Sequence, residues 1–342
     1  MIAIRAVLST LPTASLRAFL APLLAALVLL SGCDVPMRPD ARLLDKPPVT
    51  TGHFVMADGF ALPYRAWLPD VAPHAVVLAL HGMNDSRDAW EYPATAFVQN
   101  DIAVFAPDQR GFGTTADRGQ WAGRDLMTSD VRRMAELLRR KYPHTRLILM
   151  GESMGAAVLM VLAAEQSPPP VDGYVLVSPA VWGRAEMNLF LRAGLWFFSH
   201  AVPQMTVTGG GFVHVSASDN REAINRLSDD PLTIHDTRWA TLRGLVDLMG
   251  AALDDAPDFH GRGLFLYGGH DELIPRRANA AIWRALPANA REAFYPADYH
   301  LMLRDHERIT PTEDILSWIM HPDAPLPSGA DRAAKVWLDD QH

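Results

Sequence analysis

The sequence predicts an α/β protein with a mainly parallel central sheet, helices on both faces of that sheet and a helical lid insertion. Three observations support this prediction. Short apolar runs typical of buried strands alternate with longer helix patterns, as in parallel sheets. A Gly-x-Ser-x-Gly pentapeptide at residues 151–155 stands between one such strand and one such helix. The alternation breaks at about 180–231, where Trp, Phe and Leu gather, and an insertion there would lie over the serine.

The elements follow one another in a regular order. A hairpin is expected over residues 53–68, because two strand-like runs flank the turn signal Asp58-Gly59. Further strands are predicted at 75–80, 102–106, 146–150, 175–177, 264–267 and 293–295. Helix patterns fall at about 88–99, 129–141, 156–164, 235–253, 276–285 and 311–320. Ligands in such sheets bind beyond the carboxyl ends of the strands, where the motifs described below also fall.

The composition is that of a globular protein with an acidic body. The chain has 342 residues and is 49% hydrophobic, enough for one large domain with an insertion or for two small domains. Its formal net charge of −8 gives no electrostatic reason to bind nucleic acid. We therefore expect no nucleic-acid partner, and the sequence leaves the oligomeric state open.

The N-terminus has the pattern of an export signal. Arg5 and Arg17 supply a basic region, and the apolar run over 18–30 is too short for a comfortable membrane span. The run ends in Leu-Ser-Gly-Cys, in which Cys33 is the only cysteine of the chain, and this ending resembles the lipobox of bacterial lipoproteins. The resemblance implies a signal peptide over 1–32 and lipidation of Cys33. An ordinary cleaved signal with a chance cysteine and an uncleaved anchor are the alternatives.

These features divide the rest of the chain into three parts. Residues 33–50 are rich in proline and lack periodicity, so we expect a tether. Residues 51–320 are expected to form the folded domain, with its lid at about 180–231. Residues 321–342 follow as a C-terminal tail to which the sequence assigns no role. The expected location is the bacterial cell envelope, with the protein lipid-anchored to a membrane and facing the periplasm.

The Gly-x-Ser-x-Gly turn has the form of a nucleophile elbow. Gly151 and Gly155 lack the β-carbons that would collide in so tight a turn, and Ser153 is held above the sheet. A serine hydroxyl needs a base to become a nucleophile, and the base needs an orienting acid behind it. In folds with this elbow the chain order is Ser, then Asp or Glu, then His.

That order selects the other two members of a catalytic triad. His300 is the predicted base because it follows the last predicted strand. His306 lies in a charged run and His321 follows the last helix, which makes both weaker candidates. Asp271 is the predicted acid, since it lies on a Gly-led turn just past a strand. Its neighbour Glu272 is the alternative.

Backbone amides are expected to bind the oxyanion that forms during ester cleavage. One is the amide of Met154, directly after the nucleophile, and the other is that of Met83, in the loop after the strand at 75–80. Asn84 is a candidate for substrate binding, together with Trp182 and Phe190 of the lid.

Other motifs point to structural roles. His81 is interpreted as a structural hydrogen-bonding residue. The run Asp-Gln-Arg-Gly-Phe-Gly at 108–113 is not a phosphate-binding loop, because no helix starts directly on it, and it is expected to brace the site. The sequence has no His-Glu-x-x-His or paired-cysteine pattern, so we expect neither a catalytic metal nor a cofactor.

Six motifs occur in one order: His81-Gly82-Met83, Asp108 to Gly113, Gly151 to Gly155, Val177-Ser178-Pro179, Asp271 and Tyr299-His300. Together they resemble the α/β-hydrolase superfamily and, within it, the monoacylglycerol lipase and lysophospholipase branch, over residues 50–320. The resemblance implies an α/β-hydrolase fold and hydrolysis of a monoacylglycerol or lysophospholipid ester through an acyl-enzyme, with the lid holding the acyl chain. The lipoprotein-like leader is not part of that family's usual core.

Two other functions remain open at this point. The same chemistry would serve a general carboxylesterase or a serine aminopeptidase in the periplasm. The chain could also be a lipoprotein that binds a lipid or a partner and carries an idle triad.

Overall fold

The computed structural model describes residues 49–182, 187–208 and 216–341. The predicted signal peptide, Cys33 and nearly all of the predicted tether lie outside the described residues. Among the residues that are described, no helix has both the length and the apolar character needed to cross a bilayer.

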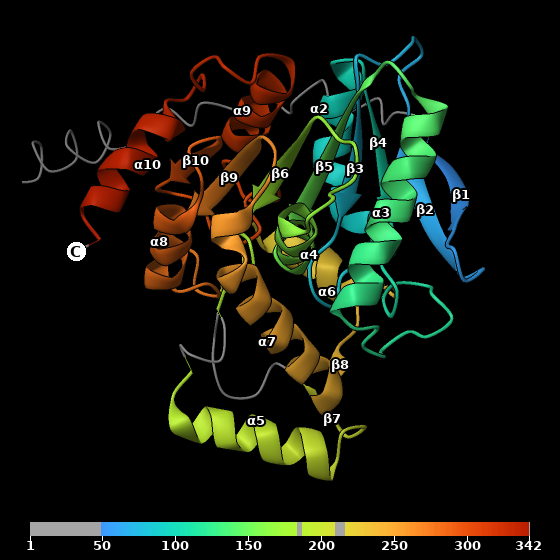
Figure 1. The fold of residues 1–342 in the computed structure, drawn as a ribbon, viewed down its shortest axis with the longest axis vertical. Coiled ribbons are helices and arrows are strands. Elements are labelled where there is room, and N and C mark those ends of the chain that lie inside the picture. Colours follow the sequence, from blue (N-terminus) through green and yellow to red (C-terminus); the bar gives the residue numbers. More distant parts are fainter. Residues whose placement is uncertain (1–48, 183–186, 209–215, 342) are drawn as a thin grey trace, which may run out of the picture. The chain divides into compact units, whose positions relative to one another are not determined.

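An eight-stranded sheet forms the centre of the described body (Figure 1). In spatial order its strands are β1 (Val49–Val55), β2 (Ala61–Trp67), β4 (Ile102–Pro107), β3 (Ala75–Leu80), β5 (Arg146–Glu152), β6 (Gly173–Val177), β9 (Gly263–Gly268) and β10 (Ala290–Tyr295). β2 pairs antiparallel with β1 and with β4, whereas every neighbouring pair from β4 to β10 is parallel. The predicted, mainly parallel sheet is therefore confirmed.

Two sets of helices cover the two faces of the sheet. α2 (Glu91–Gln99), which follows the 3₁₀ turn η2 (Arg87–Trp90), packs on one face together with α9 (Ile309–Met320). α3 (Arg124–Lys141), α4 (Met154–Ala164), α8 (Arg276–Ala285) and α10 (Ala330–Asp339) pack on the other. Successive residues of a strand point to opposite faces of the sheet. Val77 of β3 therefore joins the core beneath α2 and α9, whereas Val76 and Leu78 join the core beneath α3 and α4. The inner strands β3, β4 and β9 are fully buried because both faces of the sheet are covered there.

Residues 321–341, where a C-terminal tail was predicted, pack against this body. α10 lies against β10 at the edge of the sheet, and Trp337 is only 7% exposed. Its ring centroid lies 5.4 Å from that of Tyr267, 5.0 Å from that of Trp283 and 5.1 Å from that of Phe294. A ten-residue helix has little stability alone, and the rings that bury this one come from distant parts of the chain.

The insertion forms a cap, by which we mean the described residues between 187 and 238. It contains α5 (Leu189–Ala201), β7 (Thr206–Thr208), α6 (Arg221–Asp229) and β8 (Asp236–Arg238). β7 and β8 pair antiparallel, which carries the cap beyond its predicted end at residue 231. The predicted helix over 235–253 therefore begins only at α7 (Trp239–Asp254), since its first residues are needed for this pairing.

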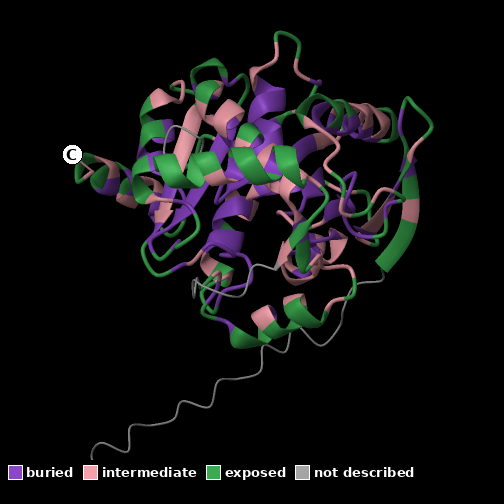
Figure 2. Ribbon diagram, turned by 90° about the horizontal axis from the view of Figure 1, so that it is seen from below, coloured by how far each residue is buried: buried purple, intermediate pink, exposed green. Residues whose placement is uncertain are grey.

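α7 connects the cap to the body. It contacts α5 at one side and α4 at the other, and it ends in the 3₁₀ turn η4 (Ala256–Asp258) before β9. Figure 1 shows α5 lying crosswise below α7, and α5, which faces the viewer in Figure 2, is mostly exposed. Only Leu195 and Ser199 are buried among the residues of α5.

Candidate active site

Ser153 stands at a sharp turn between β5 and α4. Its φ of 53° lies in the left-handed region, which costs free energy for any residue with a side chain. A β-carbon on Gly151 would lie 2.5 Å from the carbonyl carbon of Gly155, and one on Gly155 would lie 2.4 Å from the oxygen of Leu80. The predicted tight turn is therefore present, and only glycine fits at its two flanks.

Backbone hydrogen bonds hold Ser153 in this conformation. Its amide donates to the carbonyl of Val177 at 2.9 Å, and its carbonyl accepts from the amides of Ala157 at 3.0 Å and Ala180 at 3.1 Å. The serine is thus tied to β6, to the loop after β6 and to the first turn of α4. Such contacts are what allow a strained residue to persist in a folded protein.

Asp271 and His300 meet at the same edge of the sheet. The Nδ1 atom of His300 lies 2.8 Å from Oδ2 of Asp271, and their side chains are 5% and 0% exposed. The other carboxylate oxygen, Oδ1, accepts from the amides of Leu273 and Ile274 at 2.8 Å each. With its oxygens bonded in this way, Asp271 is positioned to hold the imidazole in a single orientation.

The environment of His300 favours the charged imidazolium. Burial alone lowers the pKa of His300, but the charge of Asp271 and its hydrogen bond raise that pKa above its ordinary value. A base in this state accepts a proton readily, which is the property that activation of a serine hydroxyl requires.

The alternatives to these two residues lie elsewhere. Glu272 is exposed, and its carboxylate accepts from the amide of Ser216 in the cap at 2.7 Å. His306 and His321 are both exposed. The structure thus brings Asp271, and not Glu272, to the ring of His300.

The loop after β3 passes beside the nucleophile. A β-carbon on Gly82 would lie 3.4 Å from Cβ and 3.9 Å from Oγ of Ser153. Met83, the next residue, is half-buried and packs against the core. Met154 is the first residue of α4, so its amide belongs to the positive end of the helix dipole.

His81 has a structural role, as the sequence indicates. Its Nε2 accepts from the amide of Gln109 at 3.0 Å, so its Nδ1 carries the proton and donates to the carbonyl of Gly82 at 2.8 Å. Burial lowers the pKa of His81, which keeps the ring neutral. The ring therefore fixes the course of the loop next to Ser153.

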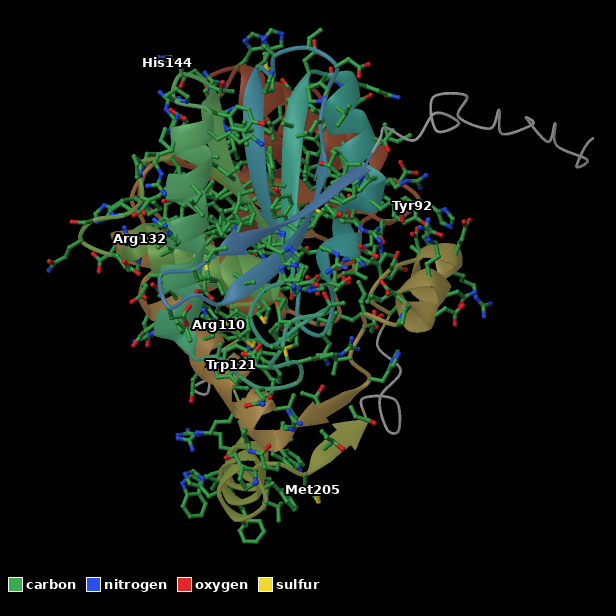
Figure 3. All side chains as sticks on the ribbon, turned by 90° about the vertical axis from the view of Figure 1, so that its right-hand side faces the viewer. Tyr92, Arg110, Trp121, Arg132, His144 and Met205 are labelled. Atoms are coloured by element: carbon green, nitrogen blue, oxygen red, sulfur yellow. The ribbon has the colours of Figure 1, made fainter. Side chains whose placement is uncertain are left out.

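The run 108–113 is held by ion pairs. Arg110, labelled in Figure 3, donates from Nε and Nη2 to the carboxylate of Asp130 at 2.8 and 2.9 Å, and it also pairs with Asp58. Asp108 is fully buried and accepts from the amide of Arg87 at 2.9 Å and from that of Thr114 at the same distance. These contacts are those of a brace between loops.

The three candidates for substrate binding lie in different surroundings. Asn84, with a φ of 63°, donates from Nδ2 to Oγ1 of Thr237 at 2.7 Å, so its side chain ties the loop after β3 to the cap. Trp182 is half-buried and packs against the core. Phe190 is 89% exposed on α5.

A buried charge cluster that the sequence did not predict lies behind the site. The guanidinium of Arg304 bonds to the carboxylates of Asp85 and Glu152, at 2.6 Å in each case. These partners are 219 and 152 residues from Arg304 along the chain, so no local spacing signals the cluster. The one available hint is that all three residues neighbour motifs at the carboxyl ends of strands.

A second missed feature is a set of bonds between the cap and the loop of His300. The amide of Leu301 donates to the carbonyl of Ala217 at 2.8 Å, and Ser218 donates from its hydroxyl to Asp305. Asp305 also accepts from the amide of Tyr299 at 2.6 Å. Burial raises the pKa of Asp305 to about 6. Residues 217 and 218, just before α6, are therefore hydrogen-bonded to the loop that carries the imidazole.

A metal ion would need several His, Cys, Asp or Glu side chains around one point. Across residues 49–182, 187–208 and 216–341, no group of three His, Cys, Asp or Glu side chains is arranged to hold one. The described residues offer the parts needed for nucleophilic catalysis. These are the hydroxyl of the half-buried Ser153 on a strained turn, an imidazole bonded to a carboxylate, and backbone amides nearby.

Comparison with known proteins finds a family model, relatives and solved structures that resemble this chain. A family model described as serine aminopeptidase, S33, matches residues 71–307. The chain is 26% identical to the monoglyceride lipase of Mus musculus over 282 residues, covering 79% of this chain and 90% of the mouse protein. It is 25% identical to the monoacylglycerol lipase of Mycolicibacterium smegmatis, covering 78% of this chain and 95% of that protein.

Solved structures share the fold at lower identity. A soluble variant of monoglyceride lipase from Saccharomyces cerevisiae superimposes with a TM-score of 0.69 at 18% identity, covering 82% of this chain and 97% of that one. A carboxyl esterase from Bacillus coagulans gives a TM-score of 0.67 at 19% identity, covering 80% and 98%.

Proposed function

Because this chain belongs to the serine aminopeptidase S33 family and has the α/β-hydrolase fold, we propose that this serine ester hydrolase acts on lipids, cleaving monoacylglycerols or lysophospholipids. The observation that carries the proposal is the bond between His300 and Asp271 at the sheet edge where the strained Ser153 stands. The relatives whose names refer to monoglyceride or monoacylglycerol support the choice of substrate.

The reaction proceeds in two halves. His300 takes the proton of the Ser153 hydroxyl, and the oxygen attacks the ester carbonyl carbon. The amides of Met154 and Met83 donate to the oxyanion of the tetrahedral intermediate. His300 then gives its proton to the leaving alcohol, which departs and leaves an acyl group on Ser153.

Water completes the cycle. His300 removes a proton from a water molecule, and the resulting hydroxide attacks the acyl carbonyl. The second tetrahedral intermediate collapses, the fatty acid leaves, and Ser153 recovers its proton from His300. Asp271 remains ionised throughout, holds Nδ1–H of His300 and stabilises the imidazolium in both halves.

Exposed apolar side chains on the cap are an argument for a lipid substrate. Leu189, Phe190, Trp196 and Phe197 of α5 are between 55% and 89% exposed. In Figure 3, where Met205 marks the neighbouring turn of the cap, ring side chains project from α5 away from the sheet. An exposed apolar patch of this kind fits contact with acyl chains or with a lipid surface.

A membrane anchor is the second part of the proposal. Leu-Ser-Gly-Cys ends the apolar run that follows Arg5 and Arg17, and we propose that Cys33 carries the lipid of a bacterial lipoprotein. The enzyme would then work in the cell envelope, facing the periplasm, with its substrate in the membrane to which it is attached.

The decisive experiment compares the full chain in detergent micelles with its Ser153→Ala variant. Both are assayed with p-nitrophenyl butyrate, a monoacylglycerol, a lysophosphatidylcholine and an aminoacyl p-nitroanilide. We expect the highest kcat/KM with a lipid ester, and a loss of about 10⁴-fold or more in the variant. Undiminished activity in Ser153→Ala would end the assignment.

Two controls sharpen the result. A fluorophosphonate probe should label the wild type and the exposed-serine variant Ser167→Ala equally, and should not label Ser153→Ala. Preference for the p-nitrophenyl ester over both lipids would instead favour a general carboxylesterase, and preference for the anilide would favour an aminopeptidase.

A further inference from the structure

Arg304 places a buried positive charge between two carboxylates. Its Nη2 atom donates to Oδ2 of Asp85 and to Oε2 of Glu152, at 2.6 Å each. The three side chains are 5%, 8% and 3% exposed, in the order Arg304, Asp85, Glu152. Charges so far from water persist only when they are paired with good geometry, so this cluster is a fixed part of the structure.

Each member of the cluster comes from a different loop of the site. Glu152 ends β5 and directly precedes Ser153. Asp85 follows Met83 by two residues, in the loop that passes beside the nucleophile. Arg304 follows His300 by four residues. One guanidinium therefore connects the nucleophile elbow, the loop of the proposed oxyanion donor and the loop of the proposed base.

The loop of Arg304 is itself held at both its amide and its carbonyl. The amide of Arg304 donates to the carbonyl of Leu301 at 2.8 Å, and its carbonyl accepts from Nδ2 of Asn220 in the cap at the same distance. The short turn between His300 and Arg304 is thus held by hydrogen bonds. A displacement of the guanidinium would therefore shift the imidazole as well.

We propose that Arg304 is a positioning residue for ester hydrolysis, which holds these three loops in register and sets, with Glu152, the charge that faces His300. This inference rests on the function proposed above. A reacting group that is misplaced by about 1 Å can lose about 10²-fold in rate, so a tie of this kind acts mainly on kcat.

The proposed effect of Arg304 and Glu152 on the charge at His300 can be measured through the pKa of His300. The groups that face it are Asp271 from the loop after β9, Glu152 from β5 and Arg304 from its own loop. Its own loop also carries the buried carboxyl groups Asp298 and Asp305. Glu152 raises the pKa of His300 and Arg304 lowers it. Arg304 stays protonated, because the paired carboxylates raise its own pKa although burial alone would lower it.

The first test removes the guanidinium. In Arg304→Met, assayed as the full chain with the soluble ester p-nitrophenyl butyrate, kcat should fall by about 100-fold while KM changes by less than about threefold. Arg304→Lys keeps the charge but not the planar donor arrangement, and it should recover part of kcat. A folded Arg304→Met enzyme with kcat within about threefold of wild type would overturn the proposal.

A variant in which the whole cluster is uncharged separates loss of activity from failure to fold. Arg304→Met leaves two buried carboxylates without a partner, whereas the triple variant Asp85→Asn, Glu152→Gln, Arg304→Met leaves none. The triple variant should fold and still show the reduced kcat, because the tie between the loops is missing. Wild-type kcat in the triple variant contradicts the positioning role.

The second test uses the pH profile. Glu152→Gln keeps an oxygen that can accept from Arg304 but removes a negative charge facing His300. The pKa of His300 then falls, and the acid limb of kcat/KM moves to lower pH. A role limited to folding would leave the limb in place, so an unmoved limb contradicts the proposed coupling.

Arg110→Met is the matched control. Arg110 is also buried and also paired with two carboxylates, those of Asp130 and Asp58, and it is not one of the main charges that shift the pKa of His300. It should lose thermal stability without moving the acid limb. Two different failures can be told apart by these variants. An active Ser153→Ala enzyme refutes the proposed function. An inactive Ser153→Ala beside a fully active Arg304→Met refutes only the role of Arg304.

Discussion

At the scale of single residues, the site depends on conformations and charges that would be unfavourable elsewhere. Ser153 has a positive φ, and Asp271 and His300 are both buried. Each is compensated by identified contacts: backbone bonds for the serine, two amides for the carboxylate, and the carboxylate for the imidazole. The neighbours thus fix the reactive geometry before any substrate arrives.

Replacing the carboxylate behind His300 should change both the rate and its pH dependence. Protonated His300 cannot act as a base, so kcat/KM falls as the pH drops through its pKa, which in the wild type lies above the ordinary value of about 6.5. Asp271→Asn removes the group that raises this pKa. We therefore expect an acid limb at lower pH and a kcat lower by about 10⁴-fold.

Steady-state kinetics of ester hydrolysis between about pH 5 and pH 9 check this prediction. Asp323→Asn serves as the control, because Asp323 is a carboxylate with an 83% exposed side chain that pairs with the half-exposed Arg262. Its profile should match that of the wild type. An Asp271→Asn enzyme whose acid limb stays in place would disprove the role given to Asp271.

The residues of the triad are predicted from the sequence because chain order and strand ends restrict the choice, and the structure shows one of the expected contacts, the bond between His300 and Asp271. Ser153 is marked by the glycines of its turn, and His300 and Asp271 by their positions after strands. Arg304 could not be predicted in this way, because its partners lie 152 and 219 residues away and neither pairing leaves a periodic signal. Asn84 was predicted to bind substrate, yet its amide is bonded to Thr237.

At the scale of elements, the inner strands followed directly from apolar runs, whereas the C-terminal helix and the end of the cap did not. β3, β4, β5 and β9 lie where unbroken apolar runs predict them, since both faces are covered. β8 is only three residues long and exists through its pairing with β7. α10 depends on rings from β9, α8 and β10 that the local sequence does not reveal.

Truncating Trp337 should show how firmly α10 belongs to the body. Its ring is buried among Tyr267, Trp283 and Phe294, so Trp337→Ala leaves a cavity and should lower the free energy of unfolding by about 3–5 kcal/mol. Its neighbour Val336 is 64% exposed, and Val336→Ala should change that free energy by less than about 0.5 kcal/mol. Urea unfolding followed by fluorescence or circular dichroism measures both. Equal stabilities would mean that α10 is not packed as described.

At the scale of the whole molecule, the apolar α5 and the proposed lipid on Cys33 support our proposal that the enzyme works at a membrane surface. Several acyl chains, at about 0.8 kcal/mol per buried CH₂, would hold the chain to a bilayer. The exposed rings of α5 would add a weaker contact of their own.

Cell fractionation tests this arrangement in a bacterial host. The wild type should incorporate labelled palmitate and sediment with membranes, whereas Cys33→Ser should incorporate none and appear largely in the soluble fraction. Adding Phe190→Ser and Trp196→Ser should remove most of any residual membrane binding, and Val336→Ser, an exposed apolar residue on α10, should not. Palmitate incorporation in Cys33→Ser would contradict the proposed anchor.

The cap differs between its two halves in how it is attached. Residues 217–220 bond to the stretch that carries the imidazole, and residues 234–237 bond to Asn84 beside the nucleophile, while the first half offers the exposed α5. A chimera that exchanges the second half for another sequence would therefore disturb the chemistry itself. Substitutions meant to alter how the enzyme meets a lipid surface should therefore begin with α5, where new side chains can be introduced while the reacting groups keep their alignment.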